Sequence, residues 1–470
     1  MNHPSFRFFG AVRNVTGSKH LLEWKGVRIL FDCGMVQGKR DKARKANLHL
    51  PFDPKEIDHV LLSHAHIDHS GGLPILVREG YRGRIWCTPG TKDLAAVLLE
   101  DSARIQEGDA DFLNRHRKNN EPEILPLYTG EDSALAIQRL KARDYHEKFE
   151  LEKGIEVEFF DAGHIIGSAQ VVVTLREGGE EFKIAFTGDH GRKDMPILRD
   201  PEPLPPVDVL VTESTYGNRL HPDEKTMEKD LAKIVREEQE DGGRLLIPAF
   251  AVGRTQNLIY LFGKLIREGK IEHIPIYVDS PLARAATSVV SNHLEDLDAD
   301  IQKMIKGGHD PFHFKDIHFT RSVEESKALN RIEHPCVIIA ASGMCEGGRI
   351  LHHLLRSLPR REDCVLVVGY MAPYTLGRRI VEKEKRVRIF RQEVQVRCQV
   401  RTMNGLSAHA DSKELISSLR HLAGSVRKCF VVHGEKDASY SLRDKLLAVG
   451  FKDVCVPVEG ERYDLWEEQG

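Results

Sequence analysis

The chain has 470 residues, enough for two to four domains with substantial hydrophobic cores. Its composition, with 41% hydrophobic and 30% charged residues and a net charge of −3, excludes a disordered chain and a generally basic one. Any polyanion that it binds must therefore meet a local basic surface.

The eight cysteines form no CxxC pair, which argues against a cysteine-ligated zinc site and against a disulfide framework. A reducing, cytoplasmic location is the expectation that follows. No apolar leader and no run of about 18 apolar residues occurs, so we expect no membrane association. The sequence leaves a homodimer open.

The first part of the chain alternates short β-rich runs with helical patterns. Strands are expected within residues 26–34, 59–64, 84–90, 155–164, 170–175 and 182–190. The pattern predicts layered sheets covered by helices. A proline-rich stretch at 201–208 is a plausible linker.

A second series of apolar runs opens at Asp208, and helical segments lie between its members. The runs are residues 208–215, 244–250, 274–280, 336–342 and 364–370. Strands that alternate with helices in this way are typical of a parallel sheet. Short strands return after about residue 395, so we predict three segments with bounds 1–207, 208–395 and 396–470.

Residues 64–69 read HAHIDH and directly follow an apolar run. In an extended segment alternate side chains face the same side, so His64 and His66 are expected to point to one place, and Asp68 and His69 to a neighbouring one. Imidazole and carboxylate groups without thiolate suit zinc or a similar divalent ion. Surface histidines or loop caps are the alternative, which explains less well the strand before the motif and the two glycines after it.

Three further polar residues end β-rich runs: His164, Asp189 and His433. Each by itself could be a cap or a turn residue. Together with the first cluster they predict a metal site that gathers ligands from several strand ends.

Longer motifs carry a resemblance to a known family. The segments HAHIDH (64–69), AGHIIGSA (162–169) and FTGD (186–189) resemble the metallo-β-lactamase superfamily. Later segments resemble the β-CASP group of nucleases within this superfamily, in particular the bacterial and archaeal relatives of the endonuclease subunit of the mRNA 3′-end cleavage factor. These segments are TESTYGNR (212–219), IPAFAVGRTQ (247–256), ASGMCEGGRILHHL (341–354), GYMAPYTLGRR (369–379), LSAHAD (406–411) and VVHGE (431–435).

The resemblance implies a fold and a ligand set. The fold is α/β, an αββα metallo-β-lactamase sandwich (1–207 and 396–470) with an inserted β-CASP domain (208–395) that contains a mainly parallel sheet flanked by helices. The implied cofactor is two divalent metal ions, with zinc favoured over manganese or iron. The implied ligands are His64, His66 and His164 for the first ion, Asp68, His69 and His433 for the second, and Asp189 as a bridge.

The resemblance also implies which residues are catalytic, and Asp68 is one of them. Asp32 would orient the histidine-bearing loop from behind, although a turn carboxylate is the alternative reading. Glu213 and His409 match the acid and histidine pair of the group. A carboxylate beside an imidazole fixes its tautomer and favours the imidazolium, which can donate a proton to a leaving alkoxide.

The function implied is a metal-dependent ribonuclease, acting as an endonuclease, a 5′-to-3′ exonuclease or both, in RNA processing or decay. Its products would carry 5′-phosphate and 3′-hydroxyl ends. RNA is favoured because DNA-repair members tend to carry valine where this chain has His433. The alternatives are a DNA nuclease, a non-catalytic RNA-binding subunit, and a hydrolase of small thioesters or lactones.

Substrate contacts are expected where basic residues gather. Between residues 345 and 404 there are thirteen Lys and Arg against six Asp and Glu. Within this stretch, the basic residues of KEKRVRIFR (383–391) are explained equally well by a solvated edge strand whose lysines discourage aggregation. The candidate phosphate contacts, for which ion pairs or turn hydrogen bonds are the alternative, are Arg254, Arg349, Arg378 and Ser407.

Overall fold

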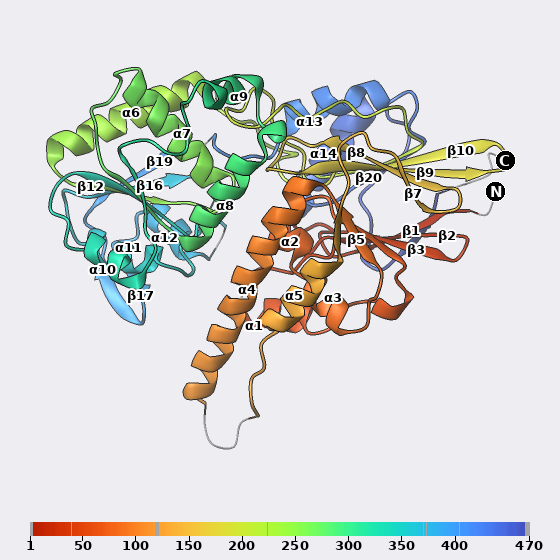
Figure 1. Ribbon diagram of the computed structural model, residues 1–470, viewed down its shortest axis with the longest axis horizontal. Coiled ribbons are helices and arrows are strands. Elements are labelled where there is room, and N and C mark those ends of the chain that lie inside the picture. The colour runs from red at the N-terminus through yellow and green to blue at the C-terminus, as the bar shows by residue number, and fades with distance from the viewer. Residues whose placement is uncertain are drawn as a thin grey trace. The chain divides into compact units, whose positions relative to one another are not determined.

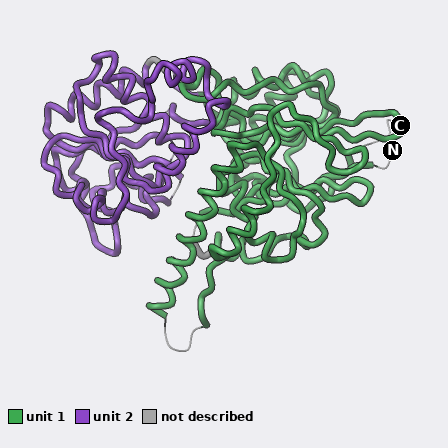
Figure 2. Tube along the Cα trace, viewed as in Figure 1, with its two compact units in different colours: residues 1–220, 409–470 green, residues 221–408 purple. Residues whose placement is uncertain are grey.

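The chain forms two compact units in a computed structural model that describes residues 3–38, 40–117, 122–222, 224–369, 371–372, 374–403 and 405–465. Unit 1 comprises residues 1–220 and 409–470, and unit 2 comprises residues 221–408 (Figure 2). Unit 1 is therefore built from two separate stretches of sequence.

The described part of unit 1 contains two seven-stranded sheets (Figure 1). The first sheet has the order β22 (Arg462–Asp464), β1 (Ser5–Phe9), β2 (Lys19–Trp24), β3 (Val27–Phe31), β4 (His59–Leu61), β5 (Arg84–Cys87) and β6 (Leu140–Ala142). The second has the order β21 (Val454–Cys455), β20 (Lys428–Val431), β11 (Val209–Thr212), β10 (Glu180–Phe186), β9 (Ala169–Glu177), β8 (Ile155–Asp161) and β7 (Phe149–Glu152).

The two sheets bury a shared aromatic core. Phe6 and Phe31 of the first sheet belong to the same buried cluster as Phe159 and Phe182 of the second. Each such side chain stabilises the fold by about 1.5 to 3 kcal/mol relative to an exposed one. The other face of the second sheet is also covered, because Val172 of β9 belongs to a separate cluster that includes helical leucines. Burial on both faces explains why the sequence of β9 is almost continuously apolar.

Helices cover the outer faces of both sheets, and local capping fixes where several of them begin. The Thr88 hydroxyl caps α4, and Thr129 with Asp132 forms a capping box at α5. This confirms the predicted αββα sandwich. The helices of unit 1 are α1 (Arg40–Asn47), η1 (Pro54–Glu56), α2 (Ile67–Ser70), α3 (Leu73–Arg78), α4 (Pro89–Arg115), α5 (Gly130–Arg139), α13 (Ser412–Leu419), η3 (Arg420–Leu422) and α14 (Lys436–Ala448).

Unit 2 is built on a six-stranded sheet in which every described pairing is parallel. The predicted parallel sheet with flanking helices is thus confirmed. Its order is β14 (Ile317–Phe319), β13 (Ile276–Asp279), β15 (Cys336–Ala340), β12 (Arg244–Pro248), β16 (Cys364–Val368) and β19 (Gln399–Met403). The remaining elements are α6 (Glu224–Asp241), α7 (Arg254–Arg267), α8 (Pro281–Asn292), η2 (Leu294–Asp296), α9 (Ala299–Lys306), α10 (Val323–Leu329), α11 (Ile350–Ser357), α12 (Leu376–Val381), β17 (Arg386–Ile389) and β18 (Gln392–Gln395).

The run at 208–215, which the sequence places at the start of the second series, forms β11 in unit 1. It pairs in parallel with β10 and with β20. Conversely, β19 lies beyond residue 395 and completes the sheet of unit 2. The domain bounds at 207 and 395 stay a prediction. Within the described ranges, no helix combines the length and the apolar character needed to cross a membrane.

Glu238 of α6 is fully buried in unit 2. Burial raises the pKa of its carboxyl to about 7, and Asp241 and Asp363 add to this while Arg401 opposes it. The carboxyl group of the unfolded chain ionises near pH 4.5, whereas that of the folded chain stays neutral until about pH 7. The free energy of unfolding therefore falls as the pH rises from about 4.5 to about 7, because ionisation of Glu238 favours the unfolded chain.

We predict that Glu238→Gln makes the protein more stable than the wild type at pH 8, by up to about 3 kcal/mol, with little difference at pH 4.5. Thermal or urea unfolding at the two pH values measures this. Glu240→Gln, at an exposed position of the same helix, is the matched control. An equal effect of both substitutions at pH 8 would contradict the assignment.

Candidate metal centre

The HAHIDH segment is held by backbone contacts to two neighbouring loops. β4 ends at Leu61 and α2 begins at Ile67, so His64 and His66 lie in the connection between them. Cys33 N donates a hydrogen bond to His69 O (2.8 Å), and Ser18 N donates to Asp68 O (2.9 Å). A Cβ at Gly34 would lie 1.6 Å from Asp68 O, so only glycine permits this close approach.

A first group of donor atoms comes from His64, His66, His164 and Asp189, which lie within 4.8 Å of one another. His66 Nδ1 is 3.1 Å from His64 Nε2 and 3.3 Å from His164 Nε2. His64, His164 and Asp189 are buried. Three imidazoles and a carboxylate at these spacings form a donor set that suits zinc.

A second group consists of Asp68, His69 and His433. His69 Nε2 lies 3.1 Å from His433 Nε2, and His433 Nε2 lies 3.6 Å from Asp68 Oδ2. His433 follows β20 in a left-handed conformation (φ 48°), and its N–H donates to Ala11 O at 2.7 Å. The strained backbone turns the imidazole toward the residues of the HAHIDH segment.

Asp189 lies between the two groups and faces each with a different oxygen. Its Oδ2 is 3.4 Å from His64 Nε2 and 3.6 Å from His164 Nε2. Its Oδ1 is 3.3 Å from His69 Nε2 and 3.3 Å from His433 Nδ1. One carboxylate can therefore contribute to two neighbouring cation sites.

The loop that carries Asp189 depends on a glycine. Gly188 has a φ of 54°, and a Cβ there would lie 2.7 Å from Ser63 Cβ. A larger residue would push the loop away from the segment that begins at Ser63. The glycine of the FTGD motif thus sets the position of the carboxylate.

The protonation states in the first group suit cation binding. Burial lowers the pKa of His64 and His164 well below the usual value, and lowers that of His66 to about 4. Burial opposes ionisation of Asp189, but the facing imidazoles of His433 and others hold its pKa well below the usual range. Neutral imidazoles and an ionised carboxylate are the forms that bind metals.

One buried atom of the group fits a bound cation. Asp189 Oδ1 accepts no hydrogen bond from the described residues, although it is buried. A buried carboxylate oxygen of this kind is costly unless a cation or a donor compensates it. The donor set, all nitrogen and oxygen, therefore fits divalent zinc.

Asp32 occupies the position behind the ligands that the resemblance implies. Its Oδ2 accepts a hydrogen bond from His69 Nδ1 at 2.6 Å. Its Oδ1 accepts from Ser63 N at 2.8 Å, and Asp32 itself has a left-handed backbone (φ 59°). Because Nδ1 of His69 is occupied, Nε2 is the atom that faces the second group.

Glu213 and His409 also meet as expected. Glu213 directly follows β11 and is fully buried, and its two carboxylate oxygens lie 3.1 and 3.2 Å from His409 Nδ1. Thr215 N and His190 N donate to the same carboxylate. Burial lowers the pKa of His409, but Glu213 and Asp189 raise it more, to about 9. His409 is therefore held as an imidazolium beside the first group.

Thr215 is a site residue that the sequence analysis missed. Its hydroxyl lies 3.1 Å from His433 Nδ1 and donates to His433 O at 3.1 Å. It thereby orients the imidazole of His433 from outside. Its place in the TESTYG motif, two residues after Glu213, was the available signal.

The four candidate substrate residues lie in unit 2, where several have partners of their own. Arg349 Nη1 donates to the buried carboxylate of Asp279 at 2.6 Å. Arg378 Nε donates to Glu382 at 2.7 Å. Arg254 lies over the ring of Phe250, with 5.0 Å between the guanidinium carbon and the ring centroid, and Ser407 is buried. Their contact with substrate stays a prediction.

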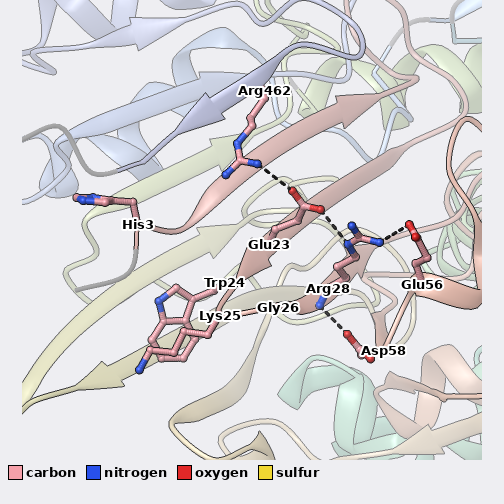
Figure 3. Close-up of a pocket in the computed structure, with 9 residues that line it drawn as sticks. All are labelled: His3, Glu23, Trp24, Lys25, Gly26, Arg28, Glu56, Asp58 and Arg462. Atoms are coloured by element: carbon pink, nitrogen blue, oxygen red, sulfur yellow. Dashed lines mark hydrogen bonds and ion pairs between the residues drawn. The ribbon is translucent and has the colours of Figure 1, made fainter.

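A separate hollow of about 450 Å³ lies on unit 1, against the first sheet (Figure 3). Its lining includes His3 and Trp24. Glu23 forms ion pairs with both Arg28 and Arg462. The charged groups there largely neutralise one another, and none of the lining residues belongs to the metal centre.

The sandwich fold, with histidines and carboxylates at its strand ends, defines a metallo-hydrolase. The sequence matches the Beta-lactamase superfamily domain over residues 27–236 and the Beta-Casp domain over residues 255–380. It matches the Zn-dependent metallo-hydrolase RNA specificity domain over residues 393–457. Two divalent metal ions, zinc by these matches and by the donor set, are the cofactor.

Relatives with known names cover nearly the whole chain. Ribonuclease TTHA0252 of Thermus thermophilus is 37% identical over 96% of this chain and 98% of its own length. Transcription termination factor FttA of Methanocaldococcus jannaschii is 31% identical over 96% of this chain and 70% of its own. Endoribonuclease YSH1 of Kluyveromyces lactis is 30% identical, and this chain spans 57% of its length. The chain belongs to the β-CASP ribonuclease family of the metallo-β-lactamase superfamily.

A solved structure shows the same fold at much lower identity. A protein of unknown function from Enterococcus faecalis V583 matches with a TM-score of 0.54 and 13% identity, over 98% of this chain and 100% of its own. This likeness supports the architecture alone.

We predict that Asp32→Ala weakens metal binding about 10- to 100-fold, because His69 loses the acceptor that fixes its ring. Metal content after dialysis and competition with a chelator measure this. Asp32→Asn is the matched control, since asparagine tolerates the left-handed backbone and keeps an acceptor. Unchanged affinity in a folded Asp32→Ala protein would contradict the role.

Proposed function

We propose that this protein is a metal-dependent ribonuclease that hydrolyses phosphodiester bonds of RNA in RNA processing or decay. The observation that carries the proposal is a carboxylate, Asp189, placed between two groups of metal-binding side chains beside the Glu213–His409 pair. The names of the relatives, a ribonuclease and an endoribonuclease among them, support RNA as the substrate.

The two groups of side chains would hold one ion each. We assign His64, His66 and His164 to one ion and Asp68, His69 and His433 to the other, with Asp189 shared. When bound, such a pair of cations lowers the pKa of water and stabilises charge on phosphate oxygens. The chain's own contribution is to bring these side chains together, most of them buried, and to orient them toward one another.

His409 is suited to donate a proton to the leaving group. Because Glu213 occupies the Nδ1 side of the ring, Nε2 is the atom left for the substrate. Hydrolysis would form a bond from water to the phosphorus while the bond to the ribose 3′-oxygen breaks. A proton from His409 to that oxygen would leave a 3′-hydroxyl end on one fragment and a 5′-phosphate end on the other. Glu213 stabilises the imidazolium before transfer.

The alternatives differ in what they cleave. A DNA nuclease would use the same site, a non-catalytic RNA-binding subunit would cleave neither polymer, and a thioester hydrolase would act on small substrates. Labelled RNA and DNA of identical sequence, with and without chelator, and a thioester assayed alongside, separate the four. The proposal requires cleavage of RNA that chelator abolishes and added zinc restores.

The direction of cleavage, the oligomeric state and the cellular location of the protein each have a separate test. Endonuclease or 5′-to-3′ exonuclease action is read from end-labelled RNA with 5′-triphosphate, 5′-monophosphate or 5′-hydroxyl ends. A homodimer is tested by light scattering of the purified protein. A cytoplasmic location, which suits the reduced cysteines, is tested by fractionation of cells.

We predict that His409→Ala lowers the rate of RNA cleavage by a factor of about 10² to 10⁴ and leaves the metal content unchanged. Initial rates under saturating RNA, together with elemental analysis, measure both. His116→Ala, at an exposed position just after α4, is the control and should behave as the wild type. Full cleavage by the His409→Ala protein would refute the proton-donor role.

A further inference from the structure

Unit 2 carries a hairpin outside its main sheet, and the turn of this hairpin is strained. β17 and β18 pair only with each other among the described strands, and Ile389 faces Gln392 in their register. Phe390 and Arg391 form the two-residue turn, with φ values of 50° and 65°. Such turns favour Asn-Gly, because other side chains are strained in the left-handed region. Two large side chains thus occupy positions that disfavour them.

One face of the hairpin is fixed against the core of unit 2. Val387, Ile389 and Val394 are buried with Ile350 and Leu354 of α11. The opposite face is exposed, and Figure 1 shows the hairpin at the rim of its unit near α10, α11 and α12. The turn is therefore exposed to solvent, while the strands that carry it are packed against the core of unit 2.

The exposed charge of the hairpin and its flanks is positive. The nearby acids are engaged, since Glu393 pairs with Arg386 and Glu384 with Arg379. Five exposed basic residues form no ion pair with any described residue: Lys383, Lys385, Arg388, Arg391 and Arg397. They would favour a polyanion.

The tip also exposes an aromatic ring. Phe390 is 49% exposed, and its ring centroid lies 4.6 Å from that of His352, with 37° between the planes. His352 supports one side of the ring, and the exposed part is available for stacking. A supported aromatic ring among basic groups is the usual platform for a base of single-stranded nucleic acid.

A hollow at the base of the hairpin continues this surface. Val396 N donates to Lys385 O at 3.0 Å and closes the hairpin. Next to this bond lies a pocket of about 430 Å³, and its lining includes Lys383, Lys385 and Val396. Basic side chains thus extend from the tip to a depression at the base.

We propose that this basic hairpin, residues 383–397, binds single-stranded RNA, with a base stacked on Phe390 and phosphates paired with Arg388 and Arg391. The proposal rests on the ribonuclease function and adds a binding surface in unit 2, which contributes none of the proposed metal ligands. Edge lysines that only prevent aggregation would require no strained, exposed phenylalanine. Charge and stacking together therefore favour RNA over an acidic protein.

The test measures the affinity of the metal-loaded protein for a fluorescent, unstructured RNA of about 20 nucleotides, by anisotropy over a range of salt. All variants are made in the His409→Ala background to suppress cleavage. Phe390→Ala should weaken binding about tenfold. The Arg388→Gln, Arg391→Gln pair should lower the slope of log affinity against log salt by about 1.4, the value for two lost phosphate contacts. Lys303→Gln with Lys306→Gln, on exposed α9 positions, removes equal charge and should change little.

A second variant separates RNA binding from folding. Phe390→Asn with Arg391→Gly supplies the residues that the turn favours, so its thermal midpoint should rise by about 2 to 4 °C while RNA affinity falls. A raised midpoint with unchanged affinity, or hairpin variants that bind like the lysine control, would overturn the inference and leave the ribonuclease function standing. Loss of the proposed function would appear separately, as a wild-type protein that cleaves no RNA.

Discussion

The buried carboxylate of Asp189 is the point at which the candidate metal-binding side chains of unit 1 converge. Each of its oxygens faces a different group of imidazoles, at 3.3 to 3.6 Å. Without a cation, the buried negative charge of Asp189 would depend on the surrounding imidazoles alone for compensation, and burying such a charge is costly in free energy. Metal binding and the arrangement of the strand-end loops would therefore be coupled, since each loop contributes a candidate ligand.

Local backbone strain maintains this convergence. Asp32 and His433 are both left-handed, and Gly34 and Gly188 sit where a Cβ would collide with a neighbouring segment. Such conformations persist only where surrounding contacts determine them. The two packed sheets and the segments that follow their strands provide those contacts, so the sandwich stabilises the strained conformations of these loops. Asp32, Thr215 and Glu213 then orient the rings of His69, His433 and His409, respectively.

Much of the candidate site could be predicted from the sequence, because its candidate ligands follow strands or belong to one compact motif. The parallel sheet followed from the alternation of strands and helices, whereas the αββα architecture followed from the resemblance to the metallo-β-lactamase superfamily. The sequence did not reveal that β11 belongs to unit 1, since a four-residue apolar strand does not indicate that it pairs with β10 and β20. Arg349 pairs with Asp279, whose burial at the end of β13 no local pattern indicates, and its contact with a phosphate stays a prediction. Thr215 was missed because a hydroxyl after a strand is common.

The central claim is that one carboxylate serves two cation sites, and the metal content of an Asp189→Asn protein tests it most directly. The wild type should retain two zinc ions per chain after dialysis against a weak chelator. The account predicts that the folded variant loses both ions under the same conditions, because each group of imidazoles loses its shared oxygen. Retention of two ions by the variant, at wild-type affinity, would contradict the account.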